Sequence, residues 1–232
     1  MDDIILSEYL KSTVYPGRGI IMGQSRDGEN IVCAYFIMGR SENSKNRVFE
    51  KTSDGIRTRA YDESKLKDPS LVIYSPIRSY RNSIIVTNGD QTDTIHDFLS
   101  EGKSFEAALR TRTFEPDPPI LTPRISGLVT IWDNTFNYRL SILKSDNQVV
   151  RYFYEYEAEP GRGHFIHTYA HNADVPPPFE GEPKKIGIDG GLEEFCELIW
   201  GSLNGDFKVS LFVSYINNKS RETKYKIINK NI

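Results

Sequence analysis

Apolar residues along this chain occur mainly in short runs, which is the pattern expected of β-strands. Runs at 19–23 and 31–38 flank the polar stretch 26–30, which has the composition of a hairpin loop. Residues 40–67 are mostly polar, so we expect loops and one short edge strand there. Further strands are expected over 71–77, 83–87, 125–132, 138–144, 149–156, 164–170 and 207–215, with a weaker strand near 225–228.

Apolar side chains spaced three and four positions apart predict three helices. These helices cover 95–99, 105–109 and 192–203. Ser104 precedes the second helix and is a suitable N-cap. The chain order is therefore strands, two helices, strands, one helix and strands. This order predicts an α+β fold, in which antiparallel sheets stack and helices cover them, rather than a parallel sheet built from βαβ units.

Length and one long loop determine the predicted domain organisation. A chain of 232 residues allows one large domain or two small ones. Residues 171–190 are rich in proline, glycine and charge, which predicts a long surface loop and the only candidate boundary. The residues after this loop are too few to form a core of their own. We therefore expect a single domain over 1–232.

Charge and hydropathy exclude several classes of protein. The net charge of −3 excludes a generally basic nucleic-acid binder, so we expect no nucleic-acid partner. The longest apolar runs are too short for a transmembrane helix, so we expect no membrane partner. The start Met1-Asp2-Asp3 lacks the positive region of a signal peptide, and the cysteines are limited to Cys33 and Cys196. We therefore expect a cytoplasmic protein with reduced, buried thiols.

Standard cofactor and metal motifs are missing from the sequence. It contains no phosphate loop, no GxGxxG opening a helix and no GxSxG elbow. His164, His167 and His171 have a spacing that suggests metal ligation. In a strand, however, His164 and His167 would point to opposite faces, and no cluster of cysteine or carboxylate residues joins them. We therefore expect neither a metal site nor a cofactor.

Three polar clusters are candidates for chemistry. Residues 87–95 lie at a strand-to-helix junction, where Thr92 or Asp93 could cap the helix or short polar groups could face a ligand. Residues 40–59 carry six basic side chains and are either a solvated loop or an anion clamp. Residues 114–117 contain Glu115, which is either a capping or surface group or, if buried, a general base.

Taken in order, these clusters resemble the archaeal-type IMP cyclohydrolase family. The run 87–95 is the most specific segment, and the ordered set is more specific than any one piece. The matching segments are 15–18 (YPGR) with a strand ending in Gly23, Arg40 with Asn46-Arg47, 69–78 (PSLVIYSPIR), 87–95 (TNGDQTDTI), 114–117 (FEPD) and 122–125 (TPRI). They span residues 15–125, and 167–169 (HTY) continues the resemblance more weakly.

The resemblance implies a fold, a reaction and a substrate. The fold is the four-layer αββα sandwich of the N-terminal-nucleophile hydrolases. The family does not use an N-terminal nucleophile, which agrees with Met1 followed by Asp2. The reaction closes 5-formamidoimidazole-4-carboxamide ribonucleotide to inosine monophosphate and releases water, without a metal or redox cofactor. The implied partner is a small purine ribonucleotide, and a homo-oligomer is left open.

Carried over residue by residue, the resemblance also implies the site. Arg47, Tyr74 and Glu115 match positions associated with catalysis. We expect Tyr74 to donate to the formyl oxygen, Glu115 to move the proton and Arg47 to bind an oxygen near the reacting groups. The expected substrate-binding residues are Arg18 and Arg124, either of which suits a phosphate, and Asn88, Thr92 and Asp93, which would shape the nucleotide pocket.

Two other functions stay open on the sequence alone. The first is a non-catalytic purine-nucleotide-binding or regulatory protein of the same fold. The second is amide hydrolysis by a related fold, which is disfavoured because no free nucleophile is visible.

Overall fold

The first two apolar runs form the predicted hairpin. In the computed structural model, which describes residues 3–69 and 71–232, β1 (Arg18–Gln24) pairs antiparallel with β2 (Asn30–Met38). This hairpin lies at the centre of a six-stranded antiparallel sheet. The other strands are β10 (Arg162–His167), β11 (Lys184–Gly187), β12 (Lys208–Asn217) and β13 (Thr223–Asn229), and the order is β11-β10-β1-β2-β12-β13.

The second sheet is built from seven antiparallel strands in chain order. Its strands are β3 (Arg47–Lys51), β4 (Gly55–Ala60), β5 (Ile77–Tyr80), β6 (Ser83–Thr87), β7 (Arg124–Trp132), β8 (Thr135–Asp146) and β9 (Gln148–Glu157). The region 40–67 holds two of these strands instead of one, together with the short helices α2 (Glu42–Lys45) and η1 (Glu63–Lys65). The prediction missed the second strand because β4 exposes its arginines and buries only alternate positions.

The predicted strand over 71–77 is wrong. The segment forms turns, in which Val72 N and Ile73 N donate to the carbonyl of Pro69, and β5 begins only at Ile77. Proline at 69 and 76 removes two of the donors that a strand ladder would need. Ser70, which belongs to the 69–78 segment, lies outside the described residues.

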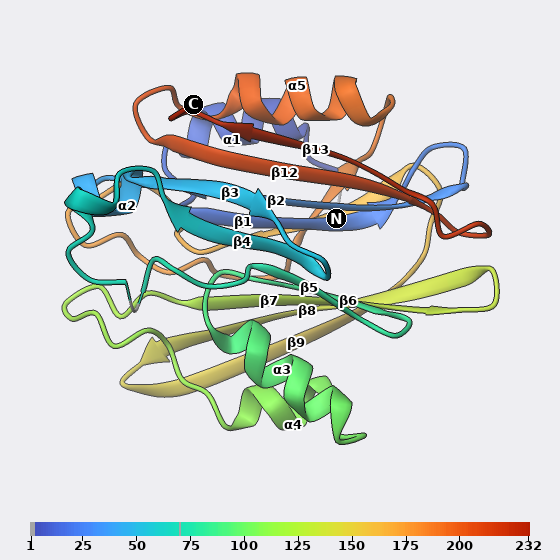
Figure 1. Ribbon diagram of the computed structural model, residues 1–232, viewed down its shortest axis with the longest axis horizontal. Coiled ribbons are helices and arrows are strands. Elements are labelled where there is room, and N and C mark those ends of the chain that lie inside the picture. The colour runs from blue at the N-terminus through green and yellow to red at the C-terminus, as the bar shows by residue number, and fades with distance from the viewer. Residues whose placement is uncertain (1–2, 70) are drawn as a thin grey trace.

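Helices cover the outer face of each sheet, so the order of layers is helix, sheet, sheet, helix (Figure 1). α3 (Gln91–Ser100) and α4 (Phe105–Arg110) lie against the seven-stranded sheet. α1 (Leu6–Thr13) and α5 (Leu192–Ser202) lie against the six-stranded sheet. The prediction of α3, α4 and α5 is confirmed, whereas α1 was not predicted, since it contributes only two apolar residues to the core.

The predicted caps have different outcomes. Ser104 caps α4 as expected, because its Oγ accepts from Ala107 N at 3.1 Å. Thr92 and Asp93 do not cap α3, because the helix already begins at Gln91. Thr92 instead lies inside the first turn, where its hydroxyl is 2.6 Å from that of Thr87.

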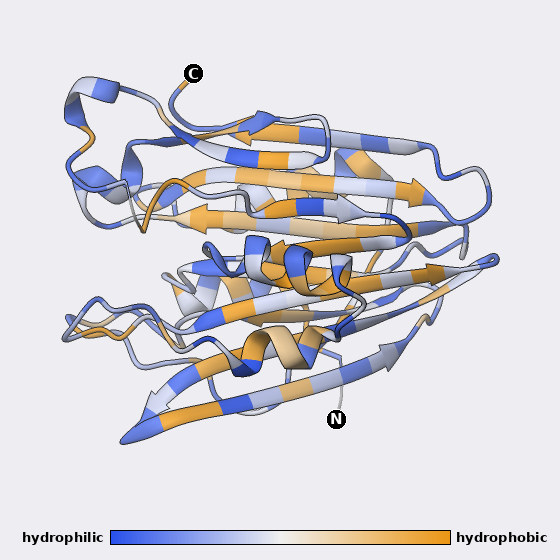
Figure 2. Ribbon diagram, turned by 60° about the horizontal axis from the view of Figure 1, so that its bottom comes forward, coloured by the Kyte–Doolittle hydropathy of each residue, from blue (hydrophilic) through white to orange (hydrophobic). Residues whose placement is uncertain are grey.

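Three apolar cores hold the layers together. Strands at the centre of the fold are buried on both faces, so they appear in the sequence as continuous apolar runs rather than alternating ones. Figure 2 shows hydrophobic residues along the middle of the strands and mostly hydrophilic residues in the turns. Alternate side chains of β2 serve two cores. Cys33, Tyr35 and Ile37 pack between the sheets, while Ala34 and Phe36 pack beneath α1 and α5.

The predicted surface loop over 171–190 is only partly correct. Residues 184–187 form β11, an edge strand that pairs with β10, and Ile186 is fully buried. Phe179 is buried too, and its carbonyl accepts from Lys144 Nζ at 3.0 Å. The segment therefore straps the two sheets together instead of standing in solvent.

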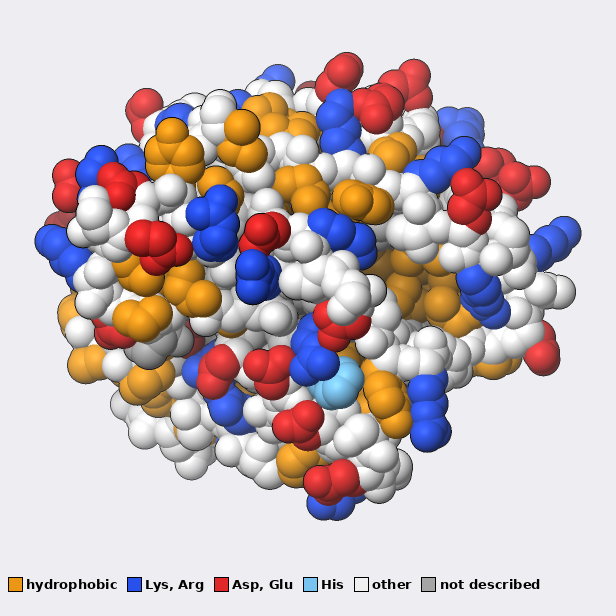
Figure 3. Space-filling view, in the orientation of Figure 1, with side chains coloured by type: hydrophobic (Ala, Val, Ile, Leu, Met, Phe, Trp, Pro, Cys, Tyr) orange, Lys and Arg blue, Asp and Glu red, His pale blue; other side chains and the backbone are white. Residues whose placement is uncertain are grey.

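Three further expectations concern the molecule as a whole. Acidic and basic side chains are interspersed on the face shown in Figure 3, in keeping with the nearly balanced charge. Among residues 3–69 and 71–232, no helix has the length and apolar character needed to cross a membrane. Met1 and Asp2, on which the expected lack of an N-terminal nucleophile rests, lie outside the described residues.

Candidate functional site

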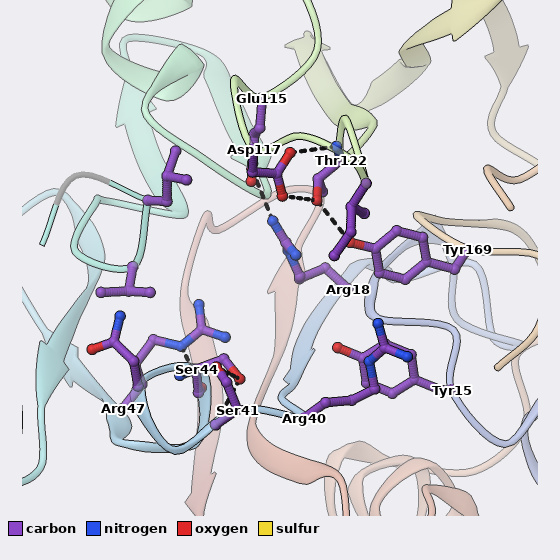
Figure 4. Close-up of a pocket in the computed structure, with 14 residues that line it drawn as sticks. Tyr15, Arg18, Arg40, Ser41, Ser44, Arg47, Glu115, Asp117, Thr122 and Tyr169 are labelled. Atoms are coloured by element: carbon purple, nitrogen blue, oxygen red, sulfur yellow. Dashed lines mark hydrogen bonds and ion pairs between the residues drawn. The ribbon is translucent and has the colours of Figure 1, made fainter. Parts of the chain in front are cut away.

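A cavity of about 290 Å³ opens at the end of the sandwich where β1 starts and β2 ends. Figure 4 shows three arginines around it, Arg18 from β1, Arg40 from the residues after β2 and Arg47 from the start of β3. Glu115 and Asp117 enter it from the loop after α4. With three cations and two carboxylates, the lining carries a formal charge of +1. The cavity is thus suited to an anionic ligand.

Arg18 and Glu115 form a buried ion pair in the wall of this cavity. Arg18 Nη2 lies 2.8 Å from Glu115 Oε1, and Glu115 is only 3% exposed. Burial raises the pKa of Glu115, although the charges of Arg18 and Arg124 oppose that rise. A carboxyl group with a raised pKa can take up and release a proton nearer to neutral pH than an ordinary glutamate.

Glycine at position 17 lets β1 begin at this point. Gly17 has a φ of +77°, and a Cβ there would lie 2.2 Å from Thr168 Oγ1 and 2.5 Å from the Tyr169 ring. The backbone N–H of Arg18 donates to the same Thr168 hydroxyl at 3.0 Å. The close approach of the two chain segments therefore needs a residue without a side chain, and it fixes where Arg18 enters the cavity.

The 87–95 segment supports this wall from behind. Arg124 Nη1 donates to Asp90 Oδ1 and to Gln91 Oε1, both at 2.7 Å. A Cβ on Gly89 would lie 2.6 Å from Arg124 Nη1 and 3.4 Å from Glu115 Oε1. Gly89 therefore allows Arg124 to lie close enough to act electrostatically on Glu115.

Three residues of this segment were predicted to shape the pocket, and none of them is among the described residues that line the cavity. Asn88 is fully buried, and its Oδ1 accepts from Ile125 N at 2.9 Å. Thr92 is also buried and bonds within its own turn. Asp93 is exposed on α3 and pairs with Arg78 at 3.0 Å. Their direct contact with a substrate stays a prediction.

Arg47 lies across the cavity from Glu115 (Figure 4), whereas the position of Tyr74 follows from its contact with Tyr35. Arg47 is 2% exposed, and its Nε donates to the carbonyl of Ser44 at 2.8 Å. The hydroxyl of Tyr74 is 2.8 Å from that of Tyr35, and both act electrostatically on Arg18. Tyr74 is not among the described residues that line the cavity, although Val72, two positions earlier, is.

A stack of aromatic and cationic groups forms the remaining wall. The rings of Tyr15 and Tyr169 are stacked with centroids 5.7 Å apart, and the Arg40 guanidinium lies 5.2 Å from the Tyr15 centroid. Arg40 also donates to the carbonyls of Ala173 and Asp174. The stack therefore ties the cavity to the segment that straps the sheets.

Of the residues predicted for the site, Arg18, Arg47 and Glu115 line this cavity, and Arg124 does not. Tyr15, Asp117, Thr122 and Tyr169 also line it, and the sequence predicts no role for them. The available signal was that each lies within or beside a resembling segment. What the sequence could not show is that residues 15, 117, 122 and 169 meet in space.

His167 makes structural contacts. His167 is fully buried, its Nδ1 lies 2.9 Å from the carbonyl of Tyr169, and its Nε2 lies 2.9 Å from the hydroxyl of Tyr9. Burial lowers the pKa of His167 to about 3. Within residues 3–69 and 71–232, no group of three or more histidine, cysteine or carboxylate residues is placed to hold a metal ion.

Comparison with known proteins agrees with this picture. The sequence model of a family described as IMP cyclohydrolase-like protein matches residues 15–220. A protein named IMP cyclohydrolase from Methanopyrus kandleri is 30% identical over 166 residues, which cover 70% of this chain and 79% of that protein. One of the same name from Methanosphaera stadtmanae is 29% identical over 164 residues, which cover 68% and 75%. A third, from Methanococcus aeolicus, is 25% identical over 190 residues, which cover 80% and 87%. All the cavity residues, from Tyr15 to Tyr169, lie within the matched range.

Proposed function

The chain belongs to the IMP cyclohydrolase-like protein family, and we propose that it closes 5-formamidoimidazole-4-carboxamide ribonucleotide to inosine monophosphate with release of water. The observation that carries this proposal is the buried Arg18–Glu115 pair in the wall of a cavity with net positive charge. It supplies a group that can move a proton, beside arginines that can bind an anionic nucleotide.

The reaction needs one bond to form and one to break. The carboxamide nitrogen attacks the formyl carbon, and one proton of that nitrogen passes to the formyl oxygen. The C–O bond then breaks, and the hydroxyl leaves as water with the proton of the formamido nitrogen. Because the amide nitrogen is a poor nucleophile, the protein must hold the two groups together, stabilise the developing oxyanion and move protons.

The proposed catalytic residues divide these tasks. Glu115 accepts the proton from the attacking nitrogen and returns it to the departing oxygen, which suits its burial and raised pKa. Tyr74 donates to the formyl oxygen. The hydroxyl pair that it forms with Tyr35 leaves one proton of the two free for such a donation. Arg47 binds an anionic or carbonyl oxygen near the reacting groups, in keeping with its place in the cavity lining.

The proposed binding residues differ in whether they line the cavity. Of the two arginines proposed for the phosphate, Arg18 lines the cavity, whereas Arg124 lies behind Glu115 and is bound to Asp90. We propose that Asn88, Thr92 and Asp93 shape the nucleotide pocket indirectly, by holding the turn that carries Gly89. This arrangement makes Arg18 the better placed of the two for direct contact.

Several broader features are part of the same proposal. We propose a single domain with a sandwich of the N-terminal-nucleophile hydrolase type, and the two sheets with their outer helices are compatible with it. We also propose that ring closure is independent of metal and takes place in the cytoplasm as part of purine biosynthesis.

An absorbance assay with the formamido ribonucleotide tests the proposal directly. Turnover that is unchanged by chelator or added divalent ions is expected. Activity that chelator abolishes and a divalent ion restores would contradict metal independence. Calorimetry with inosine monophosphate separates the alternative function, because binding without turnover would identify a non-catalytic nucleotide-binding protein.

A further inference from the structure

Tyr169 is held rigidly at the cavity with its hydroxyl in a defined place. The residue is 3% exposed and lines the cavity beside Arg18 and Glu115. Its ring is stacked on that of Tyr15, and its backbone N–H donates to the carbonyl of Pro16 at 3.2 Å. Its own carbonyl accepts from His167. Contacts on the ring and on both backbone groups therefore leave the hydroxyl little freedom to move.

A chain of three groups fixes the direction of the hydrogen bonds at that hydroxyl. Tyr169 Oη lies 2.8 Å from Thr122 Oγ1, and Thr122 Oγ1 lies 2.5 Å from Asp117 Oδ2. A carboxylate only accepts, so the Thr122 hydroxyl proton goes to Asp117. The proton between Thr122 and Tyr169 is therefore that of Tyr169. With its proton used in this way, the Tyr169 oxygen can only accept on its remaining side.

A pair of tyrosine hydroxyls near Arg18 differs in this respect. Tyr35 and Tyr74 bond to each other at 2.8 Å, and either oxygen can be the donor. Among the described contacts of the Tyr35 hydroxyl there is no carboxylate that would fix the direction of this bond, so one of the two protons can be donated elsewhere. The Tyr35–Tyr74 pair near Arg18 thus keeps a proton to donate, whereas Tyr169 in the cavity lining is an acceptor.

We propose that Tyr169 accepts a hydrogen bond from the carboxamide N–H of the substrate and so selects the reactive orientation of that group. This inference rests on the proposed cyclohydrolase function. A carboxamide on the imidazole ring can rotate so that either its oxygen or its nitrogen faces the neighbouring formamido group. Ring closure needs the nitrogen there, whereas the oxygen is held in the unreactive orientation by a hydrogen bond from the formamido N–H. An acceptor aimed at the outer N–H of the amide favours the reactive orientation.

The test compares two stable nucleotides that lack the formyl group. One carries a 4-carboxamide and the other a 4-carboxylate on the same aminoimidazole ribonucleotide. Calorimetry gives the ratio of the carboxylate Kd to the carboxamide Kd. Replacing Tyr169 by Phe should weaken carboxamide binding and lower this ratio by about tenfold, since it removes the acceptor for the amide N–H.

Asp117→Asn is the sharper variant because it should reverse the direction of the hydrogen bonds from Asp117 through Thr122 to Tyr169. Thr122 N donates to Asp117 Oδ1 at 2.7 Å, so an asparagine would keep its carbonyl oxygen there and place its NH2 group against Thr122 Oγ1. Thr122 would then donate to Tyr169, and the tyrosine proton would point into the cavity as a donor. The ratio of the carboxylate Kd to the carboxamide Kd should therefore fall by about tenfold or more.

Asp117→Asn also removes a negative charge from the cavity, which by itself favours binding of the carboxylate nucleotide. The ratio of the two Kd values is therefore measured for Asp117→Asn with Tyr169 present and again in the Tyr169→Phe background. A change in the ratio that is much larger with Tyr169 present supports the proposal, and an equal change in both backgrounds overturns it. Thr122→Val, which deletes the hydroxyl between the two residues, gives the same comparison if Asp117→Asn does not fold. Failure of the wild-type protein to bind either nucleotide would instead contradict the proposed function.

Discussion

Arg18 and Glu115 lie 97 residues apart in the chain, yet their charged groups are 2.8 Å apart in the cavity wall. Both are buried, so removing one partner leaves an uncompensated charge, which costs about 3–5 kcal/mol in such sites. The pair is therefore a structural contact as well as the proposed proton site, and substitutions there must keep the shape of the side chain if function is to be separated from folding.

Glu115→Gln should lower turnover much more than substrate affinity. The amide keeps the size of the side chain and can still accept from Arg18, but it cannot take up a proton, so we expect a loss in kcat of about a hundredfold or more. Steady-state kinetics on the folded variant measures this, with Glu101→Gln as the control, since Glu101 is an exposed carboxylate at the C-terminal end of α3. Near-wild-type turnover would show that Glu115 only supports the loop.

The pH dependence of kcat/KM should report the same carboxylate. Glu115 acts as a base in its ionised form, so activity should rise with pH as the group loses its proton. Because burial raises the pKa of Glu115, this rise should lie above the ordinary glutamate value of about 4.3. A pH–rate profile of the free enzyme measures it. The profile of E115Q should lack the rise, and a wild-type rise at or below the ordinary value would contradict the assignment.

Local pattern was enough to predict most of the elements of this fold. Hydrophobic spacing predicted the hairpin of β1 and β2, the helices α3, α4 and α5, and the long strands of both sheets. It was wrong where local chemistry competes with hydropathy. The apolar run 71–77 looks like a strand, but the prolines at 69 and 76 divert it into turns. β11 was missed because four residues beside a proline-rich stretch give no periodic signal.

The candidate site could be predicted only in part, because its members come from distant segments. Arg47 and Glu115 were predicted and line one cavity, whereas Asn88 and Thr92 are buried and are not among its described lining residues. A short polar run beside a glycine has the same composition whether it faces a ligand or holds a turn. Burial and hydrogen-bond direction separate the two cases, and neither can be deduced from the order of residues.

Tyr74→Phe tests the proposed donor to the formyl oxygen. If Tyr74 stabilises the oxyanion, loss of its hydroxyl should lower kcat by about a hundredfold with little change in affinity. Tyr35→Phe is the matched control, because it breaks the same 2.8 Å contact but leaves the Tyr74 proton free. Its kcat should fall much less. Equal losses in both variants would mean that the pair matters as a structural contact and not as a donor.

Removing the phosphate from the ligand should weaken binding strongly. Charge-assisted contacts to a phosphate contribute on the order of 1.5–3 kcal/mol each, so the nucleoside should bind at least tenfold more weakly than the nucleotide. Calorimetry with inosine and inosine monophosphate measures the difference. Arg40→Gln should reduce this difference in affinity if Arg40 also contacts the phosphate, while Arg81→Gln at the opposite end of the sandwich should leave it unchanged. Equal affinities for the two ligands would rule out a phosphate clamp.

His167 should make the fold sensitive to acid. The Tyr169 carbonyl can only accept, so His167 Nδ1 carries the proton and Nε2 accepts from Tyr9, which satisfies the neutral imidazole on both sides. Its pKa is lowered to about 3 in the folded protein, whereas in the unfolded chain it is ordinary, about 6.5. Between these two pKa values, the unfolded chain therefore binds a proton that the folded protein does not bind. The stability that His167 contributes is complete above about pH 6.5 and falls as the pH drops, by up to about 1.4 kcal/mol per unit.

Urea unfolding at several pH values should show this slope, and His167→Gln, which cannot be protonated, should flatten it. His171→Gln, at an exposed position, is the control. An unchanged slope in the His167 variant would mean that other groups cause the loss of stability in acid.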